Sequence, residues 1–290
     1  MTIESDRPFL PEAQTPLFHT SVYARLDPAQ RLRYNQLHGL YANEQILFFE
    51  QALAEDVLGA LIRQPLPQHL DESLRRFRDD EAAHSIMFRD VNQACAPELY
   101  GRGAFHFIRV PVGAWHALRA IGRRPIRFPL LVWLMLIQEE RAIHHGREIL
   151  RSAPTLEPRL VATHARHLRD EVHHVRWDQE ILDWLWPRTS PALRRINAAL
   201  FRWLVGEFFN VPRRGSVAVV RELARQCPEL LTELPNMVGA IQGLAASADY
   251  HAWVYSRRIV PHTFRRFDRW PEFTGMRRVL RAYAPAEPTP

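Results

Sequence analysis

The sequence contains no lysine, because all 38 basic residues among its 290 are arginine. This absence excludes chemistry that needs a lysine amine, such as Schiff-base formation or phosphate binding by a P-loop lysine. The formal net charge is +6, but the arginines are scattered among acidic residues and gather only in short pairs such as Arg123–Arg124 and Arg213–Arg214. We therefore expect a solvated surface and no binding to nucleic acid.

Cysteines and long apolar runs are also scarce. The two cysteines, Cys95 and Cys227, stand in no metal-ligand spacing, so we expect reduced thiols, as in a cytoplasmic protein. The first residues show no secretory signal pattern. The most apolar run, Phe128–Ile137, is far shorter than the ~20 residues that a membrane span needs. The sequence thus predicts a cytoplasmic protein that does not enter a membrane.

The sequence shows no extended alternation typical of a strand, whereas apolar residues recur at helical spacing. We expect an all-α protein with an irregular N-terminal arm (residues 1–26), one domain (27–283) and a disordered tail (284–290). Asp27-Pro28 predicts a capped helix start. The main helices are expected at about 40–62, 69–95, 129–152 and 158–186, with further helical segments at about 191–209, 217–226 and 236–257.

Two Glu-x-x-His pairs stand out on the second and fourth expected helices. His167, Glu171 and His174 occupy positions i, i+4 and i+7, so they leave one helix face. Glu81 and His84 repeat the pair at i and i+3. Two such pairs, with one inward glutamate from each of two further helices, form the ligand set of carboxylate-bridged di-metal bundles. The sequence therefore predicts a site for two metal ions.

The other two helices each offer more than one glutamate. Glu44 lies on the stripe formed by its apolar neighbours in the first helix, and a glutamate facing a core must be neutralised, paired or bound to metal. Glu50 also lies near an apolar stripe but fits the four-helix pattern less well. On the third helix, periodicity does not separate Glu139 from Glu140, because the surrounding residues are apolar nearly all round.

A single Glu-x-x-His pair is a weak signal, since it arises by chance on solvated helices. A helical scaffold in which these glutamates and histidines pair with each other, without metal, is therefore one interpretation. The duplicated pair, with an inward glutamate on each remaining main helix, favours a metal site.

His167 adds a histidine one turn before the second pair. The order Glu, Glu-x-x-His, Glu, His-x-x-x-Glu-x-x-His resembles the p-aminobenzoate N-oxygenase type of di-iron oxygenase. The resemblance implies a ferritin-like four-helix bundle core with additional surrounding helices, and two iron ions, although the spacing alone would also admit manganese. The long gap before His167 favours Glu140 over Glu139. The ligands implied are Glu44, Glu81, His84, Glu140, His167, Glu171 and His174, with no catalytic residues beyond them.

The resemblance also implies a function. Such an N-oxygenase uses dioxygen to oxidise the amine nitrogen of a small molecule towards a hydroxylamine, nitroso or nitro product in secondary metabolism. It needs an external electron donor and forms a homodimer. The alternatives are a di-iron hydroxylase or desaturase that acts on carbon, and a ferritin-like iron-handling protein. His167 argues against iron storage, because three histidines hold iron that a storage site must release.

Overall fold

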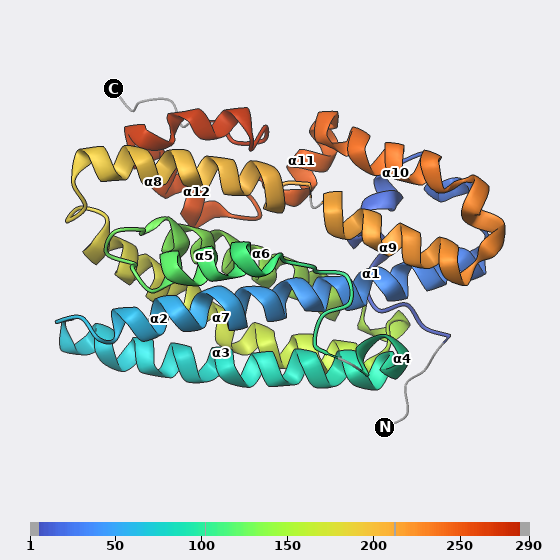
Figure 1. Ribbon diagram of the computed structural model, residues 1–290, viewed down its shortest axis with the longest axis horizontal. Coiled ribbons are helices and arrows are strands. Elements are labelled where there is room, and N and C mark those ends of the chain that lie inside the picture. Colours follow the sequence, from blue (N-terminus) through green and yellow to red (C-terminus); the bar gives the residue numbers. More distant parts are fainter. Residues whose placement is uncertain (1–5, 102, 212, 285–290) are drawn as a thin grey trace.

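The computed structural model describes residues 6–101, 103–211 and 213–284, and all regular structure in these ranges is helical (Figure 1). The expectation of an all-α, ferritin-like bundle is confirmed. The longest helices form the bundle and carry the candidate ligands, and shorter helices surround them. The bundle comprises α1 (Pro28–Phe49), the π-helical turn η4 (Glu50–Ala54), α2 (Glu55–Leu61), α3 (Gln68–Cys95), α6 (Leu130–Arg151) and α7 (Pro158–Leu185).

Helix α7 packs against both α3 and α6, and α1 packs against α3, so candidate ligands far apart in sequence face a shared interior. Helix α1, η4 and α2 follow one another without a break, and this rod runs beside α3 along the long axis of the molecule (Figure 1). The expected ranges of the four main helices agree with this arrangement, and the first helix also includes the residues between Pro28 and the expected ligand-bearing range at 40–62.

Local signals set the starts of two bundle helices. The Asp27 side chain accepts a hydrogen bond from the backbone of Gln30, whose own side chain bonds back to Asp27, and this capping box satisfies amides that the first turn leaves unpaired. At α7, Glu157 accepts from the backbone amides of Arg159 and Leu160, with Pro158 at the first helical position. The predicted helix start at Asp27-Pro28 is confirmed.

The segment before the bundle, residues 6–26, contains three short 3-10 helices and packs closely on α1. Asn35 accepts hydrogen bonds from the backbone amides of Phe9 and Leu10. A Cβ atom at Gly39 would lie 2.6 Å from the Cβ of Phe9, so only glycine allows this close approach. The 3-10 helices are η1 (Glu12–Gln14), η2 (Pro16–His19) and η3 (Tyr23–Arg25).

The remaining helices lie around the bundle, with α8 and α12 along one side and α9 and α10 at one end (Figure 1). All but the first residue of the predicted tail, 284–290, lie outside the described residues. The surrounding elements are α4 (Pro97–Tyr100), α5 (Val112–Gly122), η5 (Ala153–Thr155), α8 (Pro191–Leu204), the π-helical turn η6 (Val205–Phe209), α9 (Arg213–Gln226), η7 (Pro228–Thr232), α10 (Leu234–Gly243), η8 (Leu244–Ala246), α11 (Ala248–Val254), α12 (Pro261–Arg269) and η9 (Pro271–Arg278).

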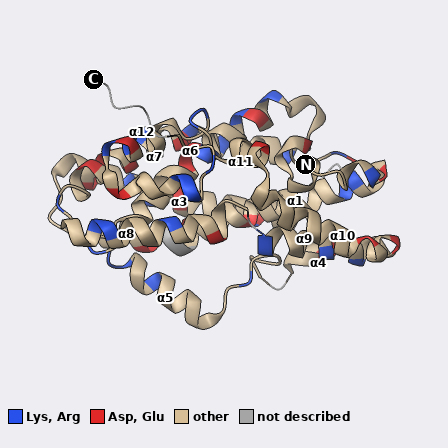
Figure 2. Cartoon of the chain, turned by 90° about the horizontal axis from the view of Figure 1, so that it is seen from above, with Lys and Arg blue, Asp and Glu red and all other residues tan. Residues whose placement is uncertain are grey.

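Arginines and acidic residues are interspersed along the same helices (Figure 2). Among the described helices, none combines the length and apolar character that crossing a membrane requires. The interior of the bundle is largely apolar, and the buried glutamates and histidines on its facing helices define the candidate site.

Candidate metal centre

Two groups of four buried side chains lie inside the bundle, and each could hold a metal ion. Within each group the potential ligand atoms all lie within 4.8 Å of one another. The groups share His84 and Glu171, so they lie side by side in one cluster. The first group is Glu50, His84, His167 and Glu171, and the second is Glu81, His84, Glu171 and His174.

Helices α3 and α7 supply both Glu-x-x-His pairs, and their apolar stripes turn these polar residues inward. On α3 the buried residues include Leu74, Phe77 and Phe88, on the same stripe as Glu81 and His84. Burial of this stripe places the glutamate and the histidine against α7, where the second pair is buried in the same way. The predicted convergence of the two pairs is therefore found in the structure.

Glu50 and His167 define the first position. The Nε2 atom of His167 lies 3.1 Å from Oε1 of Glu50 and 2.8 Å from Oε1 of Glu171. One imidazole nitrogen thus faces two carboxylates from different elements, an arrangement that a metal ion shared by all three would produce.

His84 and His174 each turn their Nδ1 atom towards the carboxylates of the cluster. The Nδ1 atom of His84 lies 3.8 to 3.9 Å from oxygens of Glu50, Glu81 and Glu171. The Nδ1 atom of His174 lies 3.2 Å from Glu81 and 3.5 Å from Glu171. Glu171 is the carboxylate that belongs to both groups, so it could contribute to holding an ion in either.

The outer nitrogens of these two histidines face aspartates. Nε2 of His84 lies 3.1 Å from Oδ2 of Asp170, and Nε2 of His174 lies 3.5 Å from Oδ2 of Asp80. Each aspartate precedes the glutamate of the pair on the opposite helix. A carboxylate on the outer nitrogen fixes the ring orientation and tautomer and makes the inner nitrogen a better ligand.

The electrostatics of the site favour a cation. Burial raises the pKa of Glu50 well above its usual value, and the charges of Glu81 and Glu171 add to this rise. Burial disfavours the His174 imidazolium, yet its carboxylate neighbours Asp80 and Glu171 raise its pKa to about 12. Burial lowers the pKa of His167, which is therefore a neutral imidazole. The raised pKa values show that this group of carboxylates attracts a proton strongly, and the same negative charges would attract a metal ion.

Several polar atoms in this cluster have no hydrogen-bond partner among the described residues. They include both carboxylate oxygens of Glu81 and of Glu171, and Nδ1 of His84 and of His174. Leaving buried polar atoms unpaired is costly, unless a bound ion satisfies them. The orphaned atoms are those that point towards the shared interior, so the residues present fit a metal centre.

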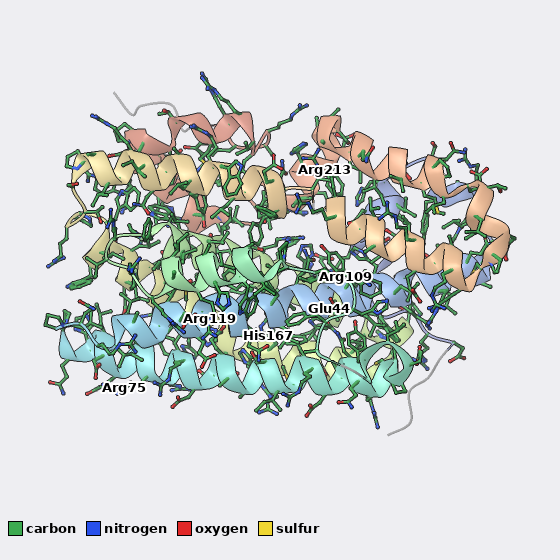
Figure 3. All side chains as sticks on the ribbon, in the orientation of Figure 1. Glu44, Arg75, Arg109, Arg119, His167 and Arg213 are labelled. Carbon is green, nitrogen blue, oxygen red and sulfur yellow. The ribbon has the colours of Figure 1, made fainter. Side chains whose placement is uncertain are left out.

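Glu44, a predicted ligand, lies outside both groups. Its carboxylate accepts hydrogen bonds from the Tyr100 hydroxyl at 2.7 Å and from the backbone amides of His106, Phe107 and Ile108 at 2.8 to 3.1 Å. Figure 3 shows Glu44 nearer than His167 to the end of the bundle that carries α4 and α9. The structure assigns Glu44 to holding the 103–108 loop against α1, and does not bring it to the cluster.

We expect Glu44→Ala to destabilise the fold without removing metal. The change leaves three buried amides and a tyrosine hydroxyl without an acceptor, which should lower the free energy of unfolding by about 2–5 kcal/mol. Glu44→Gln, which keeps one acceptor oxygen, should lose less. Urea unfolding measures the stability, and metal analysis of the folded variants gives the second readout. A metal-free but equally stable Glu44→Ala protein would contradict this role.

Glu140, the second predicted ligand outside the groups, holds helix α12. It accepts hydrogen bonds from the backbone amides of His262 and Thr263 and from the Thr263 hydroxyl, at 2.6 to 2.8 Å. Helix α12 begins after Val260, which provides no side-chain cap, so Glu140 supplies the acceptor and places its charge at the helix N-terminus. Its neighbour Glu139 instead lines a cavity together with Glu50 and His167.

Sequence analysis ranked Glu50 below Glu44 because Glu50 fits the four-helix pattern less well. In the structure the π-helical turn η4 begins at Glu50, and Glu50 belongs to the first metal-capable group. Asp80 and Asp170 were also missed, although the repeated sequence Asp-Glu-x-x-His was a signal that could have found them.

The cavity beside the first group has a volume of about 130 Å³. Its walls come from α1, α6 and α7, and residues of the N-terminal segment, η6 and α11 complete them. Glu50 and His167 form its border with the cluster, and Arg141 and the histidines His38, His145 and His164 also line it. A small molecule in this cavity would lie directly against one side of the cluster.

The fold and the site define an all-α, ferritin-like protein with buried carboxylate and histidine groups that can hold metal. The chain belongs to the family of the p-aminobenzoate N-oxygenase AurF, which matches residues 1–226. This family is one of oxygenases, so the protein is assigned to the oxidoreductases. A comparison with curated proteins found no match.

Proposed function

We propose that the protein is a di-iron N-oxygenase that uses dioxygen to oxidise the amine nitrogen of a small molecule. The observation that supports this proposal best is the pair of metal-capable groups that share Glu171 and border a cavity of small-molecule size. Family membership supports the oxygenase chemistry and the choice of iron. Manganese fits the same donor atoms, and the metal analysis described below distinguishes the two.

The proposed ligand set differs from the sequence prediction at two positions. Glu50 takes the place of Glu44 because it belongs to the first group, and Glu139 that of Glu140 because it lines the cavity beside that group. The set is Glu50, Glu81, His84, Glu139, His167, Glu171 and His174. Two ferrous ions bound there would supply the electrons that activate dioxygen.

The chain's own residues would hold the ions, orient the ligand rings and exclude water from the site. Glu171 would help to hold both ions, and Asp80 and Asp170 fix the rings of His174 and His84. The apolar core around the site excludes water from the buried side. A substrate bound in the cavity would meet the cluster at Glu50 and His167.

Arg141 is the fixed positive charge in the cavity. Its Nε donates to Nε2 of His145 at 3.2 Å, and no acidic partner lies within 4.0 Å of it among the described residues. Burial lowers the pKa of His38 to about 3 and that of His164 to about 4, and it lowers the pKa of His145 well below its usual value, so these rings are neutral. A guanidinium with no acidic partner favours a substrate that carries an anionic group.

The cavity volume limits the substrate to a compact molecule. A cavity of about 150 Å³ holds one benzene ring, and the volume here is about 130 Å³. A compact amine with a carboxylate therefore matches the charge of the cavity, and one aromatic ring is the upper limit of the size that the cavity encloses. Its carboxylate would bind Arg141, and its amine would point towards Glu50 and His167.

We expect Arg141→Gln to weaken the binding of p-aminobenzoate ~10–100-fold, because a charge-assisted hydrogen bond contributes about 1.5–3 kcal/mol. Aniline, which lacks the carboxylate, should bind both proteins alike. Isothermal titration calorimetry on metal-free protein measures both affinities. Arg147→Gln, at an exposed position on the same helix, is the matched control. Equal weakening of both ligands by Arg141→Gln would contradict anion recognition.

Product analysis tests the reaction itself. The iron-loaded, reduced protein is mixed with dioxygen and a panel of single-ring amines, and the products are identified by mass spectrometry. The proposal expects hydroxylamine, nitroso or nitro products. Oxygen inserted into carbon, with the nitrogen unchanged, would favour the di-iron hydroxylase interpretation instead. Metal uptake without any organic product would favour iron handling.

A further inference from the structure

The candidate ligand His174 is fully buried, but its ring contacts an aromatic residue that reaches the surface. Trp177 follows one turn later on α7 and is half-buried, and its ring centroid lies 5.7 Å from that of His174. Phe77 of α3 stacks on His174 at 4.1 Å and lies 5.7 Å from Trp177. These three rings form a continuous aromatic contact between the cluster and a partly exposed indole.

On its solvent-facing side, the Trp177 indole contacts two exposed side chains. The exposed ring of His173 stacks on Trp177 at 5.9 Å, with 27° between the planes. The Arg76 guanidinium lies 6.0 Å from the centre of the same indole. A molecule that approaches this part of the α3–α7 surface can therefore come close to the indole without entering the protein.

The other candidate ligand histidines offer no comparable contact in the described part of the chain. The ring of His84 contacts only His167 and His174. His167 contacts His84 and Phe88, and Phe88 is fully buried. Among the described residues, Trp177 thus combines partial exposure with a ring contact to a candidate ligand.

The position of Trp177 separates it from the substrate cavity. The cavity meets the cluster at Glu50 and His167, which belong to the first metal-capable group. Trp177 contacts His174, which belongs only to the second group. A donor at the indole and a substrate in the cavity would therefore approach opposite ends of the cluster and would not compete for space.

We propose that Trp177 is the residue through which electrons enter the metal centre, by way of the His174 ring. This inference rests on the proposed di-iron function. Two molecules of a one-electron donor, each oxidised by one electron, reduce the two ferric ions to ferrous ions, and no covalent bond forms or breaks. Because the rate of electron transfer falls steeply with the gap between donor and acceptor, aromatic rings in contact across that gap speed the transfer. Trp177 is a positioning residue, since it acts through His174.

The test is anaerobic stopped-flow reduction of the iron-loaded, oxidised protein by reduced methyl viologen, whose colour fades as it gives up electrons. We expect Trp177→Leu to slow the reduction several-fold and Trp177→Tyr, which keeps a ring, to restore most of the rate. Trp184→Leu is the matched control. Trp184 is also a half-buried tryptophan on α7 with an arginine over its ring, 5.1 Å away, but it has no ring contact with a ligand histidine among the described residues.

Two further readouts separate electron entry from a structural role. The midpoint potential of the centre and the single-turnover yield of protein loaded with ferrous iron should be unchanged in Trp177→Leu, because only delivery is altered. Equal reduction rates in wild type, Trp177→Leu and Trp184→Leu would overturn the inference and leave the di-iron function intact. A wild-type protein that holds no reducible iron would instead overturn the proposed function.

Discussion

Glu171→Gln is expected to remove most of the bound iron from the protein, which in the wild type should hold about two ions per chain. Glu171 is the fully buried carboxylate shared by both metal-capable groups, and its oxygens lie 2.8 to 3.8 Å from nitrogens of His84, His167 and His174. An amide cannot bridge two cations as a carboxylate does, so both positions lose a ligand and a negative charge. Atomic emission spectrometry of protein purified with excess iron measures the loss.

Glu140→Gln is the matched control for this prediction. Glu140 is an equally buried glutamate in the same bundle, but its carboxylate binds the start of α12. The variant should be less stable and should keep its iron, whereas Glu171→Gln should keep its helix content, measured by circular dichroism. Iron loss in Glu140→Gln, with iron retained in Glu171→Gln, would reverse the proposed assignment.

The second large effect is expected for His167→Ala, which should lower the yield of N-oxidised product by ~10-fold or more. His167 belongs only to the group that borders the cavity, so its loss weakens the position where the substrate would react. The second group, with Glu81 and His174, remains complete, and part of the iron should stay bound. Product yield per bound iron, measured in a single turnover, separates lost chemistry from lost metal.

His164→Ala is the control for metal retention. His164 is buried one turn before His167 on α7 and lines the same cavity, but it belongs to neither metal-capable group. Its removal should leave the iron content unchanged. If His167→Ala gave the same iron content and the same product yield as the wild type, His167 would not be a ligand, and the carbon hydroxylase interpretation would gain ground.

The helices and the central motif could be predicted because they depend on local signals. Helical spacing of apolar residues and the cap at Asp27 gave the main helices, and the repeated Glu-x-x-His pairs gave four of the five candidate ligands on α3 and α7. These features are set within one or two helical turns, which is the range over which sequence periodicity carries information.

The glutamates of the other two helices could not be assigned in this way. Glu44 and Glu140 point into the protein as expected, but each meets backbone amides from a distant segment, the 103–108 loop and the start of α12. An inward glutamate that caps a loop has the same local sequence as one that binds metal. Glu50 was ranked lower because it fits the four-helix pattern less well, and the π-helical turn that begins there has no signature in α-helical periodicity.

The proposed role of Arg141 in substrate recognition could not be predicted from the sequence either. It lies two residues after Glu139, and its role depends on the cavity that α1, α6, α7 and the N-terminal segment enclose together. The spacing of residues along the sequence does not predict a cavity that several distant elements form together. The contact between Trp177 and His174, by contrast, follows from their separation by one turn of α7.

Anomalous diffraction at the iron absorption edge, from crystals of the iron-loaded protein, tests the central claim most directly. The account predicts two iron positions inside the bundle, with Glu171 between them. One should lie against Glu50 and His167, and the other against Glu81 and His174. A single position, or iron bound at Glu44 or Glu140 instead of at Glu50, would contradict it.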